Sequence, residues 1–410
     1  MNVRDFLKAG HPPSLLAAFM YFDISFMVWV LLGALANSIV PDFQMSETQR
    51  GLLVAVPLLG GAILRLVLGP LTDHIGARKT GLIGLILTLI PLLLGWLWAD
   101  SFEKMLVVGL LLGVAGASFA VALPLASRWY PPQYQGLAMG IAGAGNSGTA
   151  LATFFAPRLA EMFGWQSVIG LALIPIGLTL IFFFLFAKDS PSQPPAKPVV
   201  EYVKVLRHMD TWWFCVFYSV TFGGFVGLAS FLNSFFKVQY GLTPIQAGTF
   251  ATICVVAGSF LRPIGGYLAD RFGGIRMLIL LYVGVMATMI GLGFLPELYL
   301  GTALMFLCMG FLGMGNGSVF QLVPLRFSNE IGVVTGIVGA AGGVGGFFLP
   351  TFLGYLKDQT GSFAGGFFAF AAIGLICAVA LAIVSRSWEG AFVGRGGKAV
   401  TAPVAEPAQA

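Results

Sequence analysis

Two arginines and one aspartate stand out in this sequence because of where they lie. Among its Lys, Arg, Asp and Glu residues, only Arg65, Arg262 and Asp23 fall deep inside long apolar segments. A guanidinium group cannot lose its charge there, and at the centre of a lipid bilayer it costs about 2.5–3.5 kcal/mol. Such a cost, incurred twice, indicates a function. The planar guanidinium fork is suited to bidentate binding of an oxyanion.

The two arginines occupy equivalent positions in an internal repeat. Arg65 lies eight residues before Asp73 in a Gly-x-Leu-x-Asp string, and Arg262 lies eight residues before Asp270 in a second such string. A glycine pattern recurs at nearly the same offset, with Gly136, Gly140 and Gly143 matched by Gly332, Gly336 and Gly339. The sequence therefore consists of two related halves, and repeats of this kind lie on opposite sides of a central path.

Two cations facing each other across such a path repel strongly unless an anion lies between them. The repeat therefore predicts that Arg65 and Arg262 form an anion clamp. One alternative is that each arginine pairs with a buried acid, but Asp23 could serve only one of them. The other is that the side chains extend to the membrane interface, which is a long reach from the centre.

The composition indicates which elements position these residues. The 410 residues are 58% hydrophobic and 10% charged, with a mean hydropathy of +0.90, which excludes a water-soluble globule. Twelve apolar segments are long enough to cross a bilayer core of about 30 Å. They lie at residues 14–40, 49–71, 80–99, 104–127, 136–157, 165–187, 211–236, 245–269, 276–295, 299–325, 331–354 and 363–385. We expect an all-α membrane protein.

The polar segments divide this chain into parts. A proline-rich stretch at 188–210 predicts a linker between a six-helix half at 1–187 and a second at 211–385, and residues 386–410 are predicted to be a disordered tail. With the N-terminus in the cytoplasm, fifteen Lys and Arg residues lie on the cytoplasmic side and five outside. This asymmetry predicts that both termini are cytoplasmic, in a plasma (inner) membrane.

Other classes of function find no support in the sequence. The topology explains the net charge of +5, so we expect no nucleic-acid partner. The four cysteines lie in apolar segments without metal-ligand spacing, so we expect no metal site and no cofactor. No nucleophile–base pair, metal cluster or phosphate-binding loop indicates an enzyme. We expect a monomer in the lipid bilayer.

The doubled loop, the twelve segments and the central linker together resemble the major facilitator superfamily. That resemblance implies two six-helix halves around a substrate path, with alternating access. The charged residues of the two loops, Asp73, Arg78, Asp270 and Arg276, can cap helix ends and are predicted to gate the cytoplasmic face. The alternative is that they are ordinary polar turns that orient the protein.

Two glycine-rich strings narrow the resemblance to the nitrate/nitrite porters. GIAGAGNSG and GAAGGVGGFFLP are similar to that family's signatures in the fifth and eleventh helices, and the family also has one arginine in each of the second and eighth helices. The resemblance implies transport of nitrate, and also of nitrite. It implies substrate contacts from these residues: Arg65, Arg262, Asn146, Tyr218, Phe222, Phe119, Gly143 and Gly339.

Uptake of an anion against a negative-inside potential costs about 2.3 kcal/mol per charge per 100 mV, so it requires coupling. None of the three histidines lies in a span, and Asp23 is the only buried carboxylate. We expect Asp23 either to carry a proton or to pair with an arginine, and favour proton symport over nitrate/nitrite exchange. A purely structural carboxylate is the alternative.

Three rival functions stay open. The first is a porter for another small anion, such as formate, or for an organic acid. The second is a drug/proton antiporter, which should show buried acids where this sequence shows arginines. The third is an anion sensor that does not transport, which the short loops disfavour.

Overall fold

The computed structural model describes residues 3–191, 199–327 and 331–399. Within these ranges the chain forms helices and no β-strand; the one β-type contact is an isolated bridge between Glu389 and Val393. Eleven helical segments are long and apolar enough to cross a membrane. The all-α membrane fold predicted from the sequence is therefore confirmed.

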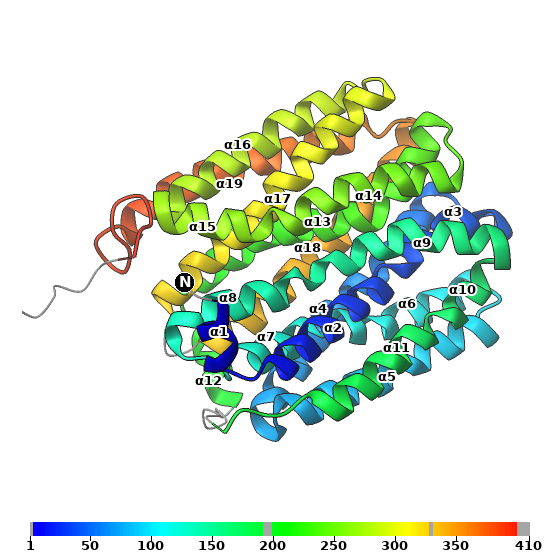
Figure 1. The fold of residues 1–410 in the computed structure, drawn as a ribbon. Coiled ribbons are helices and arrows are strands. Elements are labelled where there is room, and N and C mark those ends of the chain that lie inside the picture. The colour runs from blue at the N-terminus through cyan, green and yellow to red at the C-terminus, as the bar shows by residue number, and fades with distance from the viewer. Residues whose placement is uncertain (1–2, 192–198, 328–330, 400–410) are drawn as a thin grey trace, which may run out of the picture.

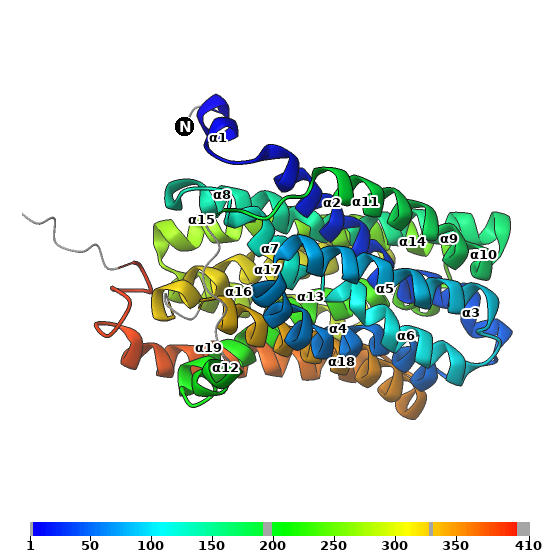
Figure 2. The ribbon, with the colours of Figure 1, turned by 90° about the horizontal axis from the view of Figure 1, so that it is seen from below.

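Each half of the chain forms one side of the bundle (Figure 1). The first half contains α2 (Pro12–Trp29), α3 (Leu31–Asp42), α4 (Glu47–Ile75), α5 (Ala77–Leu97), α6 (Phe102–Gly116), α7 (Phe119–Ser127), α8 (Pro132–Gly143), η1 (Ala144–Ser147), α9 (Gly148–Phe163), α10 (Trp165–Leu171) and α11 (Leu173–Phe186). The second contains α13 (Met209–Tyr240), α14 (Pro244–Phe260), α15 (Arg262–Phe272), α16 (Gly274–Gly293), α17 (Leu298–Arg326), α18 (Ile331–Thr360) and α19 (Ala364–Trp388). Two short helices, α1 (Val3–Ala9) and α12 (Val199–Val205), precede the halves, and α1 lies off the side of the bundle in Figure 2.

The fifth predicted span is the one absent from the eleven long helices, because η1 interrupts it between α8 and α9. Two of its glycines lie directly against α2. A Cβ at Gly148 would lie 1.8 Å from the carbonyl oxygen of Asp23, and one at Gly145 would lie 2.6 Å from the Phe22 ring. Only glycine fits at such approaches, so the glycine string lets α2 contact the backbone of the interrupted span.

The repeated loop has the same backbone in both halves. Gly76, between α4 and α5, has φ of +92°, and Gly273, between α15 and α16, has φ of +101°. Residues with a side chain rarely adopt this conformation, so glycine makes both tight reversals possible. The two glycines are separated by the same 197 residues as Arg65 and Arg262, so the repeat seen in the sequence is also a repeat in the structure.

The halves touch at one end and are apart at the other. We name the ends after the predicted orientation: the outer end carries residues 42–47, 240–244 and 360–364, and the inner end carries the two repeated loops. The hydrogen bonds described between the halves lie at mid-bundle or nearer the outer end. Toward the inner end, a Cβ at Gly140, Gly143 or Gly336 would have no described neighbour within 4 Å.

Part of the predicted tail lies against the bundle. In the described residues 386–399, α19 continues to Trp388 and the following turns lie against the start of α16. There the backbone N–H groups of Gly274 and Arg276 donate to the carbonyls of Gly397 and Gly396 at 3.3 Å. The remainder of the predicted tail, and part of the predicted linker, lie outside the described residues.

Glycine contacts between helices generate the first prediction. A Cβ at Gly113 of α6 would lie 2.1 Å from the carbonyl carbon of Gly60 in α4, so Gly113→Ala forces the helices apart. We expect a loss of about 1–3 kcal/mol in stability, as for other overpacked interiors, visible as a lower melting temperature in detergent. Gly177→Ala on α11 is the control, because nothing lies within 4 Å of that position. Equal melting of both variants would contradict this packing.

Candidate functional site

Arg65 lies in the middle of α4 and is 1% exposed. Its Nε donates to the carbonyl oxygen of Gly116 at 3.0 Å, and its Nη1 donates to that of Gly339, in the other half, at 2.6 Å. Its Nη2 has no hydrogen-bond partner among the described residues. The charge of Arg65 is therefore held by backbone carbonyls, and no described carboxylate forms an ion pair with it.

Aromatic rings surround the Arg65 guanidinium. Its Cζ lies 5.1 Å from the ring centroid of Trp29, 5.4 Å from that of Phe119 and 5.0 Å from that of Phe222. The negative faces of aromatic rings attract cations, by about 2 kcal/mol or more where water is excluded. These three rings partly replace the counter-ion that Arg65 lacks.

Arg262 approaches the same ring from the other half. Its Cζ lies 5.5 Å from the centroid of Phe119, so both arginines contact one phenylalanine. Its Nη1 is buried without a hydrogen-bond partner in the described part of the chain. The fold thus brings the two arginines of the repeat to one place, as the sequence predicts, with the Phe119 ring beside both of them.

Tyr218 and Phe222 form another wall of this space. Their rings are stacked, with centroids 5.1 Å apart, and Phe320 of α17 meets Tyr218 edge-on at 4.9 Å and Phe119 at 6.1 Å. The Tyr218 hydroxyl group is buried; its oxygen can accept a hydrogen bond from the Arg262 guanidinium, which leaves its own O–H proton without an acceptor among the described residues. It interacts electrostatically with both guanidinium groups, which places an O–H donor close to the two cations.

Asn146 belongs to η1, the interruption of the fifth span. Its backbone carbonyl accepts hydrogen bonds from Thr149 Oγ1 at 2.6 Å and from Ser259 Oγ of α14 at 3.3 Å. Ser259 precedes Arg262 by about one helical turn, so η1 contacts α14 near the level of the second arginine. The Asn146 side chain is fully buried, yet neither of its amide atoms has a partner in the described residues.

The unpartnered groups have a common chemistry. Buried polar atoms are nearly always hydrogen-bonded in folded proteins, and each exception requires an explanation. Here the exceptions include N–H or O–H donors on Arg65, Arg262, Tyr218 and Asn146. Several donors and two positive charges without an acid fit a site for an anion, because a bound anion would satisfy them together.

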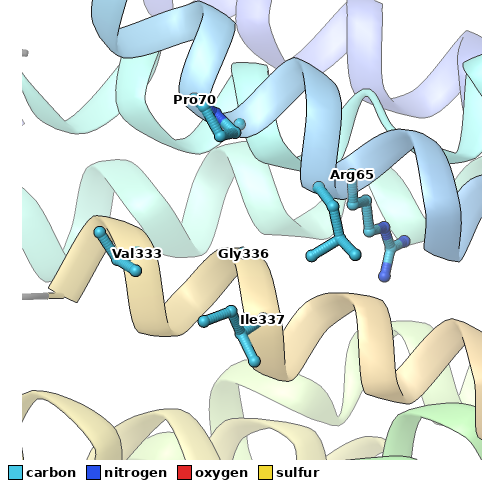
Figure 3. A pocket seen from close by; sticks show the side chains of 7 residues that line it. Arg65, Pro70, Val333, Gly336 and Ile337 are labelled. Carbon is cyan, nitrogen blue, oxygen red and sulfur yellow. The ribbon is translucent and has the colours of Figure 1, made fainter. Parts of the chain in front are cut away.

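A cleft leads to Arg65 between the two halves. It is lined by Arg65, Leu66, Gly69, Pro70, Val333, Gly336 and Ile337. Figure 3 shows the Arg65 side chain pointing from α4 toward α18, with Pro70 and Val333 farther along toward the inner end. The predicted site residue Gly339 lies at Arg65, whereas Gly143 faces open space.

Asp23 does not contact an arginine in this structure. It is 8% exposed, and its Oδ1 lies 2.6 Å from Ser147 Oγ, at the end of η1. Ser147 Oγ also lies 2.8 Å from the carbonyl oxygen of Ala144. In this conformation Asp23 contacts a neighbouring hydroxyl group, and among the described residues it pairs with neither Arg65 nor Arg262.

The residues predicted to gate the inner face lie at its loops. Asp73 forms an ion pair with Arg128, after the end of α7. The backbone N–H of Arg78 donates to Asp189 Oδ1 at 2.9 Å, and its Nη2 donates to the Phe184 carbonyl at 2.9 Å. Asp270 is exposed at the end of α15, and the Arg276 side chain lies against Gly396 of the tail. These loops therefore tie each half to its own connecting segments.

Comparison with known proteins identifies the family. The Major Facilitator Superfamily profile matches residues 17–350. A relative from Bacillus subtilis, named nitrite extrusion protein, is 36% identical over 354 residues, covering 85% of this chain and 88% of the relative. A relative from Mycobacterium tuberculosis, named "Probable nitrate/nitrite transporter NarK2", is 32% identical over 385 residues, covering 92% and 96%. The chain belongs to the nitrate/nitrite porter family of this superfamily.

Solved structures agree with the fold of this family member. The human organic anion transporter MFSD10 (TETRAN) superposes with a TM-score of 0.72 at 14% identity, covering 90% of this chain and 99% of that one. A bacterial homologue of the human lysosomal transporter Spinster, in an inward-facing and occupied conformation, gives a TM-score of 0.68 at 18% identity, covering 91% and 96%. At these identities the likeness concerns the fold alone.

Sequence reasoning missed two aromatic residues beside the arginines and one buried amide in this porter. Trp29 and Phe320 complete the aromatic walls, but nothing in the sequence distinguishes them from other aromatic residues of the spans. Asn316 of α17 is fully buried, and both its amide atoms lack partners in the described residues. Its neighbours in sequence, Gly315 and Gly317, pack on Thr221 and on the backbone carbonyl of Arg262. An amide inside an apolar segment was the signal that could have found it.

The unequal contacts of the two arginines generate a prediction. Arg65→Met removes two charge-assisted hydrogen bonds to carbonyls and should lower stability by about 2 kcal/mol or more. Arg262→Met removes a cation that repels Arg65, so melting in a buffer of bulky organic anions should be unchanged or higher. Differential scanning fluorimetry of both purified variants measures this. Equal destabilisation would show that Arg262 has a partner of its own.

Proposed function

We propose that this chain transports nitrate, and also nitrite, across the inner membrane by alternating access. The observation that carries the proposal is that Arg65 and Arg262, one from each half, lie against one Phe119 ring without an acid partner among the described residues. The names of the relatives from Bacillus subtilis and Mycobacterium tuberculosis support the same substrates.

The proposed bound state follows from the chemistry of the anion. Nitrate is planar and singly charged, so its oxygen atoms can accept hydrogen bonds in one plane from guanidinium groups on two sides. Tyr218 and the amides of Asn146 and Asn316 supply further donors. The rings of Phe119, Phe222 and Trp29 exclude water, which strengthens these electrostatic interactions. A weakly hydrated anion also loses less free energy on entering such a space than a strongly hydrated one.

The proposed cycle uses the electrostatics of the empty site. An anion between the guanidinium groups relieves their repulsion and draws the halves together around the site. The cleft to Arg65 then closes at the inner end while the outer end opens, or the reverse. Asp73, Arg78, Asp270 and Arg276 hold the inner loops during this movement. We further propose a monomer with both termini in the cytoplasm, as the charge asymmetry predicts.

The clamp is tested by substitutions that keep the positive charge but remove the planar guanidinium group. In proteoliposomes, Arg65→Lys and Arg262→Lys should each reduce nitrate uptake at least about a hundredfold, because an ammonium cannot bind two oxygens of one anion in the plane of a guanidinium. Arg386→Gln, an exposed residue at the end of α19, is the control. Counterflow against nitrate, nitrite, chloride and formate identifies the substrate. Wild-type rates in either lysine variant would refute the clamp.

We propose that Asp23 couples transport to a proton. Ser147 has a single hydroxyl proton, but two acceptors lie within hydrogen-bond distance of its oxygen, Asp23 Oδ1 and the Ala144 carbonyl. If Ser147 donates to Ala144, a protonated Asp23 can donate to Ser147. If Asp23 is ionised, Ser147 turns toward it. The pair thus accommodates both protonation states beside η1, which carries Asn146.

Asp23→Asn tests this coupling. The variant should lose nitrate accumulation driven by a pH gradient, because the amide cannot release a proton, while anion exchange across the same vesicles continues. Vesicles with and without a pH gradient, loaded with nitrite or left empty, separate the two activities. Asp100→Asn, an exposed acid, is the control. If Asp23→Asn still accumulates nitrate with the gradient, nitrate/nitrite exchange with a structural Asp23 is the better interpretation.

A further inference from the structure

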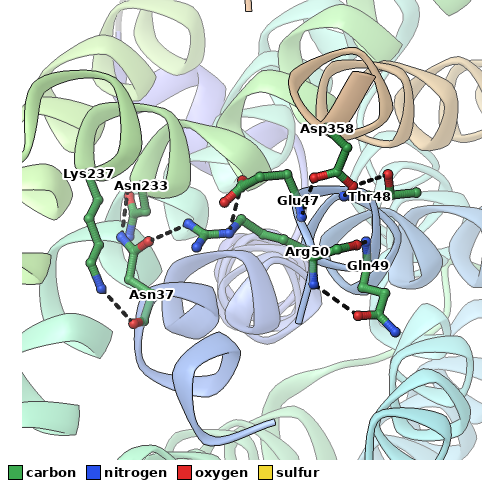
Figure 4. Close-up of polar contacts among 9 residues, drawn as sticks. Asn37, Glu47, Thr48, Gln49, Arg50, Asn233, Lys237 and Asp358 are labelled. Atoms are coloured by element: carbon green, nitrogen blue, oxygen red, sulfur yellow. Dashed lines mark hydrogen bonds and ion pairs between the residues drawn. The ribbon is translucent and has the colours of Figure 1, made fainter. Parts of the chain in front are cut away.

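A polar network joins the two halves at the outer end, about four helical turns from the arginines. Asn37 of α3 donates through Nδ2 to the backbone carbonyl of Asn233 in α13 at 2.7 Å (Figure 4). Asn233 donates through its own Nδ2 to the carbonyl of Ala34 at 3.1 Å. Each asparagine therefore binds the backbone of the opposite half. Both side chains are at most 3% exposed.

The two asparagines are equivalent residues of the repeat. They are separated by 196 residues, the offset that also relates the glycines of the fifth and eleventh spans. The helices meet in backbone contact beside them, because a Cβ at Gly33 would lie 2.2 Å from the carbonyl oxygen of Ser230. The first and seventh spans thus cross at a two-fold-related point where each half supplies the same amide.

Two cations converge on the same asparagine. Arg50 Nη1 of α4 donates to Asn37 Oδ1 at 3.3 Å, and Lys237 Nζ of α13 donates to the Asn37 backbone carbonyl at 2.9 Å. Both cations lie within helices, and Arg50 is 7% exposed. Arg50 also pairs with Glu47 at 3.3 Å. Separating the halves would leave these charges to be rehydrated.

A second contact fastens the start of α4. The Asp358 carboxylate of α18 accepts hydrogen bonds from the backbone N–H groups of Glu47 at 3.0 Å and Thr48 at 2.7 Å. These N–H groups have no partner within their own helix, and a carboxylate is favoured at this end of the helix dipole. Here the capping carboxylate comes from the other half of the molecule, so this bond too must break if the outer end opens.

We propose that Asn37, Asn233, Arg50 and Lys237, with Asp358, form a latch that holds the outer end closed and sets the balance between the two orientations of the transporter. The inference rests on the proposed alternating access, since a latch needs an open state to oppose. The latch bonds that cross between the halves are made while the outer end is closed, so losing one of them favours the state in which the outer end is open.

The latch is tested by measuring the distance between the halves rather than transport. Nitroxide labels on Asp100→Cys and Glu297→Cys report the outer end, and labels on His74→Cys and Arg271→Cys report the inner end; all four positions are exposed. The native cysteines are buried, so they should take up little label. Distance distributions by pulsed electron resonance give the populations of the open and closed outer end.

We expect graded effects. Asn233→Ala removes one bond between halves and should raise the open-to-closed ratio of the outer end roughly fivefold. Asn37→Ala likewise removes one side-chain bond between the halves, to the Asn233 carbonyl, so a similar rise is expected; the double variant Asn37→Ala/Asn233→Ala, which loses both bonds, should raise the ratio further, by roughly tenfold or more. The inner pair should move closer in parallel. Tyr240→Phe is the matched control, because the Tyr240 hydroxyl bonds Pro296 within one half at the same end.

The outcomes separate this proposal from the proposed function. Unchanged distributions in both asparagine variants, or an equal shift in Tyr240→Phe, would overturn the latch. Nitrate-induced thermal stabilisation, measured on the same variants, should persist because the arginines are untouched. If wild-type protein gains no stability from nitrate but the distances still shift as expected, the latch stands and the substrate assignment fails. Thermal melting also identifies a variant that has merely failed to fold.

Discussion

Two guanidinium groups held together in a low-dielectric interior are the constraint on which the rest of this structure depends. Their mutual repulsion and the loss of hydration are both unfavourable, and no described carboxylate compensates for them. Neutral groups stabilise the Arg65 charge instead: two backbone carbonyls accept its hydrogen bonds, and the rings of Trp29, Phe119 and Phe222 lie close to it. A carboxylate would satisfy the charges permanently, whereas carbonyls and rings leave room for an anion to come and go.

The glycine content serves this arrangement. Trp29 can reach Arg65 because Gly61 and Gly116 lie against its indole, where Cβ atoms would come within 2.7 and 2.1 Å. Gly342 makes room for Tyr218 and Phe222 in the same way, at 2.7 and 2.8 Å. Close helix approach, which is the usual role of glycine in membranes, is thus also what brings bulky rings around a buried cation.

The sequence predicted the spans, the repeat and the two arginines, because the length and hydropathy of each segment, and the similarity of the two halves, can be read directly from the residues. Through the family resemblance it also proposed Asn146, Tyr218, Phe222 and Phe119 as substrate contacts. Apart from the meeting of the two arginines, it could not predict contacts between the halves. Hydropathy gives no partner for Arg50 or Lys237, because long side chains at a helix end can turn back into the protein. Their shared partner, Asn37, is identified only by the packing of α3 on α13.

The duplication explains why the central site and the outer end can respond together. Each half contributes one arginine to the central site and one asparagine to the outer end. The same helices carry residues of both places: α4 holds Arg50 and Arg65, and α13 holds Lys237 and Tyr218. Fifteen helical residues span about 22 Å, and in α4 this stretch includes Pro57. Each of these two helices therefore carries residues of the central site and of the latch, and in the proposed cycle a movement of either helix relative to the other half displaces both sites.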